Sequence, residues 1–225
     1  MEVYNDAHVH YGHNADIDKE NWKSNAETTF VMSTGSDHSG GNEIILGWSK
    51  HDPSIKAFWW FDNNSDIPDS VFGGKYHGAY TKKTINKDFH AQQLEQLKGK
   101  VLIVHCGMFL NGSIESHTSF RHALNIAENY PDIQVILAHM GGSTNPVIKK
   151  AIKHAKTDNV WFDTSGITNP LIIEYACNKF DENRILFGSD IPWCSLNAML
   201  YNIVDADITD NQKEKILYSN MLQLL

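Results

Sequence analysis

The sequence has few cysteines and no long apolar run, and each shortage excludes a class of protein. Its three cysteines, Cys106, Cys177 and Cys194, are an odd number at wide spacing, which indicates neither a disulfide framework nor a C-x-x-C metal site. We expect free thiols that pack as small hydrophobes. No apolar run approaches the length of a membrane span, and the N-terminus lacks a secretory signal, so we expect a cytoplasmic protein without a membrane partner.

Positive charge is also scarce. Lys and Arg total 19 against 27 Asp and Glu, and this formal net charge of -8 argues against binding to a phosphate backbone, so we expect no nucleic-acid partner. The two arginines, Arg121 and Arg184, fall on a predicted helix and at the start of a predicted strand, where neither is placed to clamp an anion. Because positive charge is scarce, we expect a small-molecule substrate that is not strongly anionic.

The chain is long enough for one substantial core. It has 225 residues, of which 41% are hydrophobic and 20% charged, as is ordinary for a globular protein. No repeat, low-complexity tract or Pro/Gly/Ser-rich linker divides it, although "GKYHGAYTKKTINKDFH" is polar enough for a long active-site loop. We therefore expect a single domain over residues 1–225.

Short apolar runs alternate with helix-like segments along the chain. The six clearest runs are "TTFVMSTG", "IKAFWWF", "KVLIVHCG", "IQVILAHMGG", "NVWFDTSG" and "RILFGSD". Such runs are typical of strands buried on both faces, and helix signatures such as "SHTSFRHALNIAENYP" and "NPVIKKAIKHAK" lie between them. With the opening "MEVYNDAHVH" and a weaker run at "SVFGGKYH", eight strand candidates predict an α/β fold, a compact (β/α)8 barrel. A doubly wound sheet is the structural alternative.

Two histidines stand two positions apart near the start of the chain, in "NDAHVHYGHN". On a strand, His8 and His10 project to the same face while Val9 points away. Two imidazoles side by side suit a metal ion. In a chain with 12 histidines, one H-x-H tripeptide is weak evidence for a metal site. The assignment of a metal site therefore depends on further ligands elsewhere in the chain.

Further metal-capable side chains come at the ends of other predicted strands. His105 ends "KVLIV", His139 ends "IQVILA", and Asp190 follows "RILFGS". In a (β/α)8 barrel the carboxyl ends of the strands carry the catalytic groups. We therefore expect these residues to face one mouth together with His8 and His10, whereas the histidines on predicted helices are structural or exposed.

The motifs "DAHVH", "GGKYH", "VHCG", "AHMGG", "VWFDTSG" and "ILFGSDIPW" resemble the amidohydrolase superfamily, particularly its amidohydrolase-2 branch. They run in order from Asp6 to Trp193, and "EKILYSNMLQLL" is similar to the branch's C-terminal helix. The resemblance implies a (β/α)8 barrel of the metallo-dependent hydrolase type. Some members are metal-dependent decarboxylases of small carboxylic acids.

The resemblance also implies roles for the residues. His8 and His10 match the ligand pair of the first strand, His105 the ligand of the fifth, and Asp190 the carboxylate that contacts both metal and water. His139 matches a histidine that acts on substrate or water in one-metal members and binds the second ion in two-metal members. Such a donor set suits Zn²⁺, so we expect one divalent ion, with two as the alternative.

The chemistry of these groups is consistent with hydrolysis. A divalent ion lowers the pKa of water to about 7 and polarises a carbonyl. Asp190 would take the proton of the water and pass it to the leaving group, and His139 would stabilise the developing oxyanion. We expect a hydrolase that cleaves an amide, lactone or ester, with decarboxylation as the alternative reaction.

Lys75 and His77 are similar to a Lys-x-His segment of the branch's fourth strand, although Gly78 follows where the family has proline. We expect both residues to bind substrate, Lys75 as a point charge for a carboxylate or phosphate. Two alternatives for Lys75 stay open: a carboxylated lysine that bridges two metals, as in other amidohydrolase branches, and a lysine exposed on a loop.

Two other functions are alternatives to the hydrolase. A barrel-type nuclease also begins with H-x-H, but it usually has a glutamate where this chain has Lys75, and the acidic balance disfavours DNA. A catalytically silent barrel that binds a small molecule is the non-enzyme alternative, since fold does not imply function. The short length leaves little room for insertions, which indicates an open mouth that a second subunit, in a homodimer, would complete.

Overall fold

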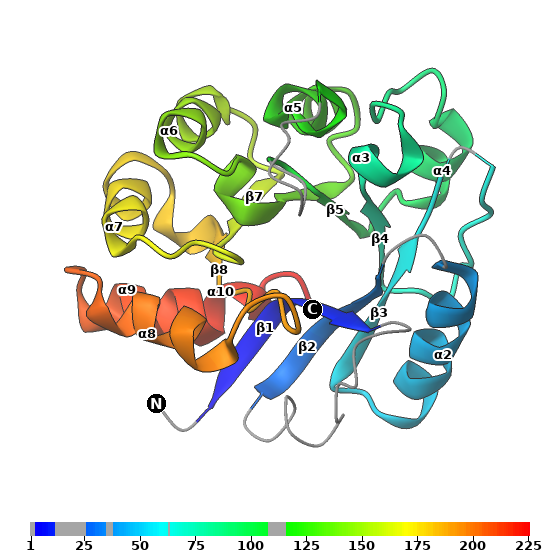
Figure 1. Cartoon of the computed structure of the whole chain (residues 1–225). Coiled ribbons are helices and arrows are strands. Elements are labelled where there is room, and N and C mark those ends of the chain that lie inside the picture. The colour runs from blue at the N-terminus through cyan, green and yellow to red at the C-terminus, as the bar shows by residue number, and fades with distance from the viewer. Residues whose placement is uncertain (1–2, 12–25, 35–37, 63, 108–115) are drawn as a thin grey trace.

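The computed structural model describes residues 3–11, 26–34, 38–62, 64–107 and 116–225. Within them, eight parallel strands form one sheet in sequence order from β1 to β8, and helices surround it (Figure 1). The predicted (β/α)8 barrel is confirmed. The doubly wound alternative is wrong, because the spatial order of the strands never departs from their order in the chain.

Each strand corresponds to a predicted run. The strands are β1 (Tyr4–Tyr11), β2 (Ala26–Ser33), β3 (Ile55–Trp60), β4 (Gly73–Tyr76), β5 (Val101–Val104), β6 (Gln134–Leu137), β7 (Val160–Asp163) and β8 (Ile185–Leu186). For the first strand, the predicted Met1 and Glu2 lie outside the described residues. The segment expected as a long loop contains β4 and a short helix.

The helices that follow the strands include α2 (His38–His51), α3 (Gly78–Thr81), α4 (Ala91–Gln96), α5 (Phe120–Asn129), α6 (Asn145–His154), α7 (Pro170–Lys179), α8 (Leu196–Asp205), α9 (Asp210–Glu214) and α10 (Asn220–Leu222). Short 3-10 turns occur at Ser116–Thr118, Ala138–Gly141 and Glu182–Arg184. The C-terminal segment, expected as one helix, is continued between α9 and α10 by a π-helical turn at Lys215–Ser219. Among the described helices, none combines the length and the apolar character that a membrane span requires.

Helix α4 is short, because the chain must turn into β5. It ends at Gln96. The Leu97 N–H then donates to carbonyls of the helix, and the Lys100 N–H donates to Leu97 O, so the chain turns tightly here. Gly99 has a left-handed φ of 74°, which glycine adopts without a steric penalty, and its N–H donates to Asp132 O at 2.9 Å.

An apolar floor lies beneath the ends of the strands. Phe58, Ile103 and Trp161 belong to one buried cluster, and each lies two positions before a residue of the site: Trp60, His105 and Asp163. Alternate residues of a strand share a face, so the apolar side chains fill the barrel and the polar ones follow at its mouth. The side chains at the mouth therefore stand on a dry, packed base.

The barrel closes between β1 and the segment after β8. Ala7 N donates to Phe187 O at 2.8 Å, Asp190 N to His8 O at 2.8 Å, and His10 N to Ile191 O at 2.9 Å. The Asp6 carboxylate adds contacts, since its Oδ1 accepts from the N–H groups of His8 and Ser189 at 3.1 and 3.0 Å. These bonds hold Asp190 against the two histidines of β1.

At the opposite end of the barrel, Asn159 joins a helix to two strands. Its Nδ2 donates to the carbonyls of Ala127, Tyr130 and Ile133 at 3.0, 3.2 and 2.9 Å, and it is buried just before β7. Asn159→Ala removes the side-chain donor that these three carbonyls share. We expect the free energy of unfolding, measured in urea, to fall by about 1–3 kcal/mol.

The matched control is Asn178→Ala, which removes an exposed amide that donates to Glu174 O within its own helix. We expect this change to alter the free energy of unfolding by less than about 0.5 kcal/mol. Equal losses in the two variants would contradict the anchoring role of Asn159.

Candidate active site

His8 and His10 project from β1 toward the same point. Their Nε2 atoms are 3.1 Å apart, and both rings are buried. Val9, between them, points away into the core that faces the helices. The structure thus brings together the two histidines that the sequence places two positions apart.

The hydrogen-bond partners of the two rings fix where their protons are. His8 Nδ1 lies 2.8 Å from Asp163 Oδ2, and His10 Nδ1 lies 2.9 Å from Ser33 O. A carboxylate and a carbonyl can only accept, so each Nδ1 carries a proton, and in the neutral tautomer that fits these partners the lone pair is on Nε2. Two lone pairs therefore face each other, which is unfavourable unless a cation lies between them.

Asp190 supplies a third donor from the segment after β8. Its Oδ1 lies 3.6 Å from His8 Nε2 and 3.5 Å from His10 Nε2, and one donor atom from each of the three residues falls within 4.8 Å of the others. Donors about 2.0–2.2 Å from one ion are separated by about 3–3.5 Å. The three residues therefore fit a divalent ion, which agrees with the donor types that the sequence predicts.

The Asp190 carboxyl is held ionised. Burial alone would raise its pKa, but contact with the imidazoles of His10, His139 and His8 outweighs burial and holds the pKa well below its usual range. Its backbone φ of 58° is left-handed, a conformation that aspartate tolerates better than most residues. The strained turn therefore presents a charged carboxylate to the two imidazoles.

Lys75 lies on β4 beneath the histidines rather than on an exposed loop. Its side chain is fully buried, and Nζ lies 3.2 Å from His8 Nε2. Burial lowers its pKa to about 8, although the negative charges of Asp163 and Asp190 act in the opposite direction. The interpretation of Lys75 as an exposed loop lysine is thus wrong, whereas its contact with a substrate stays a prediction, since it does not line the pocket.

His139 and His105 form a second pair of imidazoles. His139 Nε2 lies 3.1 Å from His105 Nδ1, and His139 follows β6 with a left-handed φ of 56°. His105 lies outside the three-donor group, and its buried Nε2 has no hydrogen-bond partner among the described residues. Its role as a metal ligand therefore stays a prediction.

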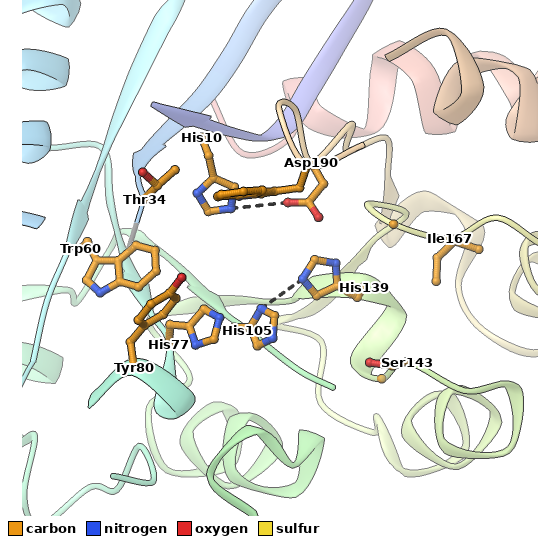
Figure 2. A pocket seen from close by; sticks show the side chains of 13 residues that line it. His10, Thr34, Trp60, His77, Tyr80, His105, His139, Ser143, Ile167 and Asp190 are labelled. Carbon is orange, nitrogen blue, oxygen red and sulfur yellow. Dashed lines mark hydrogen bonds and ion pairs between the residues drawn. The ribbon is translucent and has the colours of Figure 1, made fainter. Parts of the chain in front are cut away.

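A pocket of about 330 Å³ opens above these groups. Its lining residues are His10, Thr34, Trp60, His77, Tyr80, His105, His139, Gly142, Ser143, Gly166, Ile167, Asp190 and Trp193. Figure 2 shows Trp60, His77 and Tyr80 grouped on one side, with His139 across the pocket from them. His77 thus lines the pocket, and its contact with a substrate stays a prediction.

The grouped rings form a flat aromatic wall. His77 stacks on His105 with ring centroids 3.7 Å apart, and on Trp60 at 5.5 Å, with interplanar angles of 14° and 11°. Burial, together with the charges of Lys75 and His10, lowers the pKa of His77 to about 2, so this ring is neutral. Trp60 and Trp193 both line the pocket, whereas the neighbouring Trp59 does not.

Sequence reasoning gave no role to three residues of the site. Tyr80 lines the pocket from α3, and Asp163 and Ser165 lie behind His8 and His139. Asp163 ends β7 in the motif "VWFDTSG", so the strand-end rule that selected His105 and His139 also applies to it. Tyr80 has no comparable signal, because it comes from a short helix within the segment expected as a loop.

The sequence profile of the Amidohydrolase family (Amidohydro_2) matches residues 94–225, which is more than half of the chain. The chain belongs to the amidohydrolase family. This agrees with the resemblance carried by the strand-end motifs. A comparison with curated proteins finds no match.

Solved structures with the same fold include several decarboxylases. A 2,6-dihydroxybenzoate decarboxylase in complex with 2,6-dihydroxybenzoate matches with a TM-score of 0.75 and 14% identity, over 100% of this chain and 99% of that chain. A dihydroxybenzoic acid decarboxylase from Polaromonas sp., with bound manganese and 2-nitroresorcinol, has a TM-score of 0.67 and 14% identity, over 100% and 97%.

A third structure is the 5-carboxyvanillate decarboxylase from Novosphingobium aromaticivorans, complexed with manganese and 4-hydroxy-3-methoxy-5-nitrobenzoic acid. It has a TM-score of 0.72 and 10% identity, over 100% of this chain and 96% of that chain. At such identities these structures show the barrel fold of this chain. Manganese is bound in two of these three structures.

The buried Asp6 predicts how stability depends on pH. Burial raises its pKa to about 7, although hydrogen bonds from Ser189 and His8 lower it in part, whereas an unfolded aspartate titrates near about 3.9. The folded state therefore binds a proton more tightly than the unfolded state. The contribution of Asp6 to stability is full below about pH 4 and is lost as the pH rises through about 7.

Asp6→Asn removes this titration. In metal-free protein, we expect the unfolding free energy of wild type to fall between pH 5 and pH 7.5, relative to Asp6→Asn, by up to about 1.4 kcal/mol per pH unit. Urea unfolding at the two pH values measures this difference. Asp132→Asn, at an exposed position, is the control and should follow wild type. Parallel curves for wild type and Asp6→Asn would contradict the role of Asp6.

Proposed function

We propose that the protein is a metal-dependent decarboxylase of a small aromatic carboxylic acid. The observation that carries the proposal is the aromatic wall of Trp60 and His77, which faces the metal-capable donors across the pocket. The wall suits a planar ring, and the donors suit an ion that binds its carboxylate or hydroxyl oxygens. The named activities of the structurally similar decarboxylases support this choice.

The size and charge of the pocket narrow the substrate class. A cavity of about 330 Å³ lies at the lower end of ligand sites and suits a single substituted ring. Among the described residues that line it, none is an arginine, and the neutral His77 offers a flat face rather than a charge. We therefore propose one carboxylate per substrate, with positive charge supplied by the ion and by Lys75 behind it.

We assign one divalent ion to His8, His10 and Asp190, because their donor atoms converge on one position. Such a donor set suits Zn²⁺, and manganese is present in two of the similar structures, so both metals are candidates. When bound, the ion stabilises negative charge on the oxygens of the substrate. A second ion, held by His139 with His105 or with a carboxylated Lys75, is the alternative.

Decarboxylation requires one proton transfer that the residues of the chain must perform. The bond between the ring carbon and the carboxylate breaks, CO₂ leaves, and the electron pair that stays on the carbon takes up a proton. Asp190 is held ionised and therefore carries no proton to give. His139 faces the pocket and shares a hydrogen bond with His105, so we assign the proton at that pair to the ring carbon.

Hydrolysis of an amide, lactone or ester is the second candidate. The ionised Asp190 favours it, because a carboxylate at the mouth can take a proton from water and then return it to a leaving group. His139 would then face the developing oxyanion. The description of the matched family as amidohydrolase supports the same reaction.

A homodimer, a cytoplasmic location and one domain over residues 1–225 stay predictions.

Product analysis separates the two reactions. We expect metal-loaded protein to release CO₂ from at least one hydroxylated benzoic acid, measured by a coupled bicarbonate assay and by loss of the substrate's ultraviolet absorbance. A matched panel of amides, lactones and esters is followed with a pH indicator. Turnover confined to that panel, with no CO₂ released from any carboxylic acid, would overturn decarboxylation and leave hydrolysis.

The role of His139 predicts a loss of turnover with metal binding retained. We expect His139→Asn to lower kcat by about 10²–10⁴-fold, because the imidazole pair that holds the proton is lost, while the Kd for Mn²⁺ changes by less than about threefold. His154→Asn, at an exposed helix position, is the matched control. If His139→Asn retains the kcat of wild type, the assignment of the proton to this residue is wrong.

A further inference from the structure

The motif "VWFDTSG" ends β7 with a carboxylate that faces the proposed metal site from behind. Asp163 is fully buried, and its Oδ2 lies 2.8 Å from His8 Nδ1. Its Oδ1 accepts from the N–H groups of His139 and Ser165 at 3.0 and 3.1 Å, and from the Ser165 hydroxyl. One carboxylate thus contacts a proposed metal ligand and the backbone of the proposed proton donor.

The contact with His8 decides which nitrogen of the ring is free for a cation. Asp163 Oδ1 already accepts from the backbone of His139 and Ser165 and from the Ser165 hydroxyl, and Oδ2 faces the ring nitrogen of His8 at 2.8 Å, so this carboxylate acts as an acceptor toward His8. The proton of neutral His8 must then be on Nδ1. The lone pair on Nε2 therefore points toward His10 and Asp190.

Ser165 extends the same contact to the ring of His139. Its hydroxyl donates to Asp163, so its oxygen is free to accept from His139 Nδ1, which lies 2.9 Å away. The Ser165 carbonyl also lies 3.0 Å from this nitrogen. His139 thus keeps a proton on Nδ1 and turns Nε2 toward His105 and the pocket.

We propose that Asp163 is the positioning residue of the site: it holds His8 in the tautomer that binds metal and, through Ser165 and the backbone, fixes the orientation of His139. The proposal rests on the proposed function in one respect, which is the ion at His8, His10 and Asp190. Carboxylates that accept from a metal-binding histidine typically change metal affinity by about 10–100-fold when they are removed.

The conservative change Asp163→Asn should reverse the tautomer of His8. The amide oxygen must stay at the Oδ1 position, because the donors of His139 and Ser165 surround it. The amide NH₂ then faces His8 Nδ1, which has to accept, so the proton of the ring moves to Nε2. That nitrogen can no longer bind a metal, although the shape of the side chain is unchanged.

The test measures metal affinity in the full-length chain. Metal-free wild type and Asp163→Asn are titrated with Mn²⁺ and with Zn²⁺ in competition with a chromophoric chelator. We expect at least about 10-fold weaker binding of both metals by the variant. Asp158→Asn, an exposed position before the other end of β7, has the same change of charge and should bind as wild type does.

Ser165→Ala distinguishes the two roles proposed for Asp163, which are to hold the tautomer of His8 and to orient His139. It leaves the 2.8 Å contact between Asp163 and His8 in place and removes the hydroxyl that lies between Asp163 and His139 and 3.2 Å from His8 Nδ1. We expect its metal affinity to stay within about threefold of wild type, well short of the loss expected for Asp163→Asn. Equal weakening by the two variants would overturn the assignment to the carboxylate.

A spectroscopic measurement on wild type covers the case in which Asp163→Asn does not fold. ¹⁵N NMR of histidine-labelled, metal-free protein identifies the protonated nitrogen of each ring, with His8→Gln used to assign the signal. We expect His8 to carry its proton on Nδ1, and a proton on Nε2 would overturn the proposal. If wild type binds neither metal, the metal site fails, and the NMR measurement still decides the tautomer of His8.

Discussion

The site depends on two imidazole nitrogens that face each other at 3.1 Å with their lone pairs exposed. Acceptors on the far sides of both rings, Asp163 and Ser33, impose that arrangement. Backbone hydrogen bonds between β1 and the segment after β8 then bring the ionised Asp190 to the same point. Negative potential is therefore concentrated in a buried place where a divalent cation is the natural partner.

The packing of the barrel makes this arrangement rigid. Apolar residues fill the interior beneath the strand ends, so the polar groups have little water and few alternative conformations. The ammonium of Lys75 lies within hydrogen-bond distance of His8 and supplies positive charge beside the converging donors. The same low-dielectric surroundings strengthen each contact among Asp163, His8 and His139, and they would make an unpaired member costly.

Much of the fold and part of the site follow from the sequence. The eight strands were predictable because apolar runs buried on both faces are hard to mistake, and the strand-end rule selected His8, His10 and Asp190, whose donors the structure brings together. The strand-end rule predicts at which end of the barrel a residue lies, but it does not predict the direction in which the side chain points. His105 illustrates the difference, since stacking on His77 turns it toward His139. Asp163 was not assigned a role because it acts through His8.

The central claim is that a divalent ion lies between His8, His10 and Asp190, and anomalous diffraction tests it most directly. Crystals grown with Mn²⁺, with data collected on both sides of the manganese absorption edge, locate the ion without any assumption about activity. The account predicts one strong peak about 2.0–2.3 Å from His8 Nε2, His10 Nε2 and Asp190 Oδ1. A peak only at the His105–His139 pair, or no peak within the barrel, would contradict it.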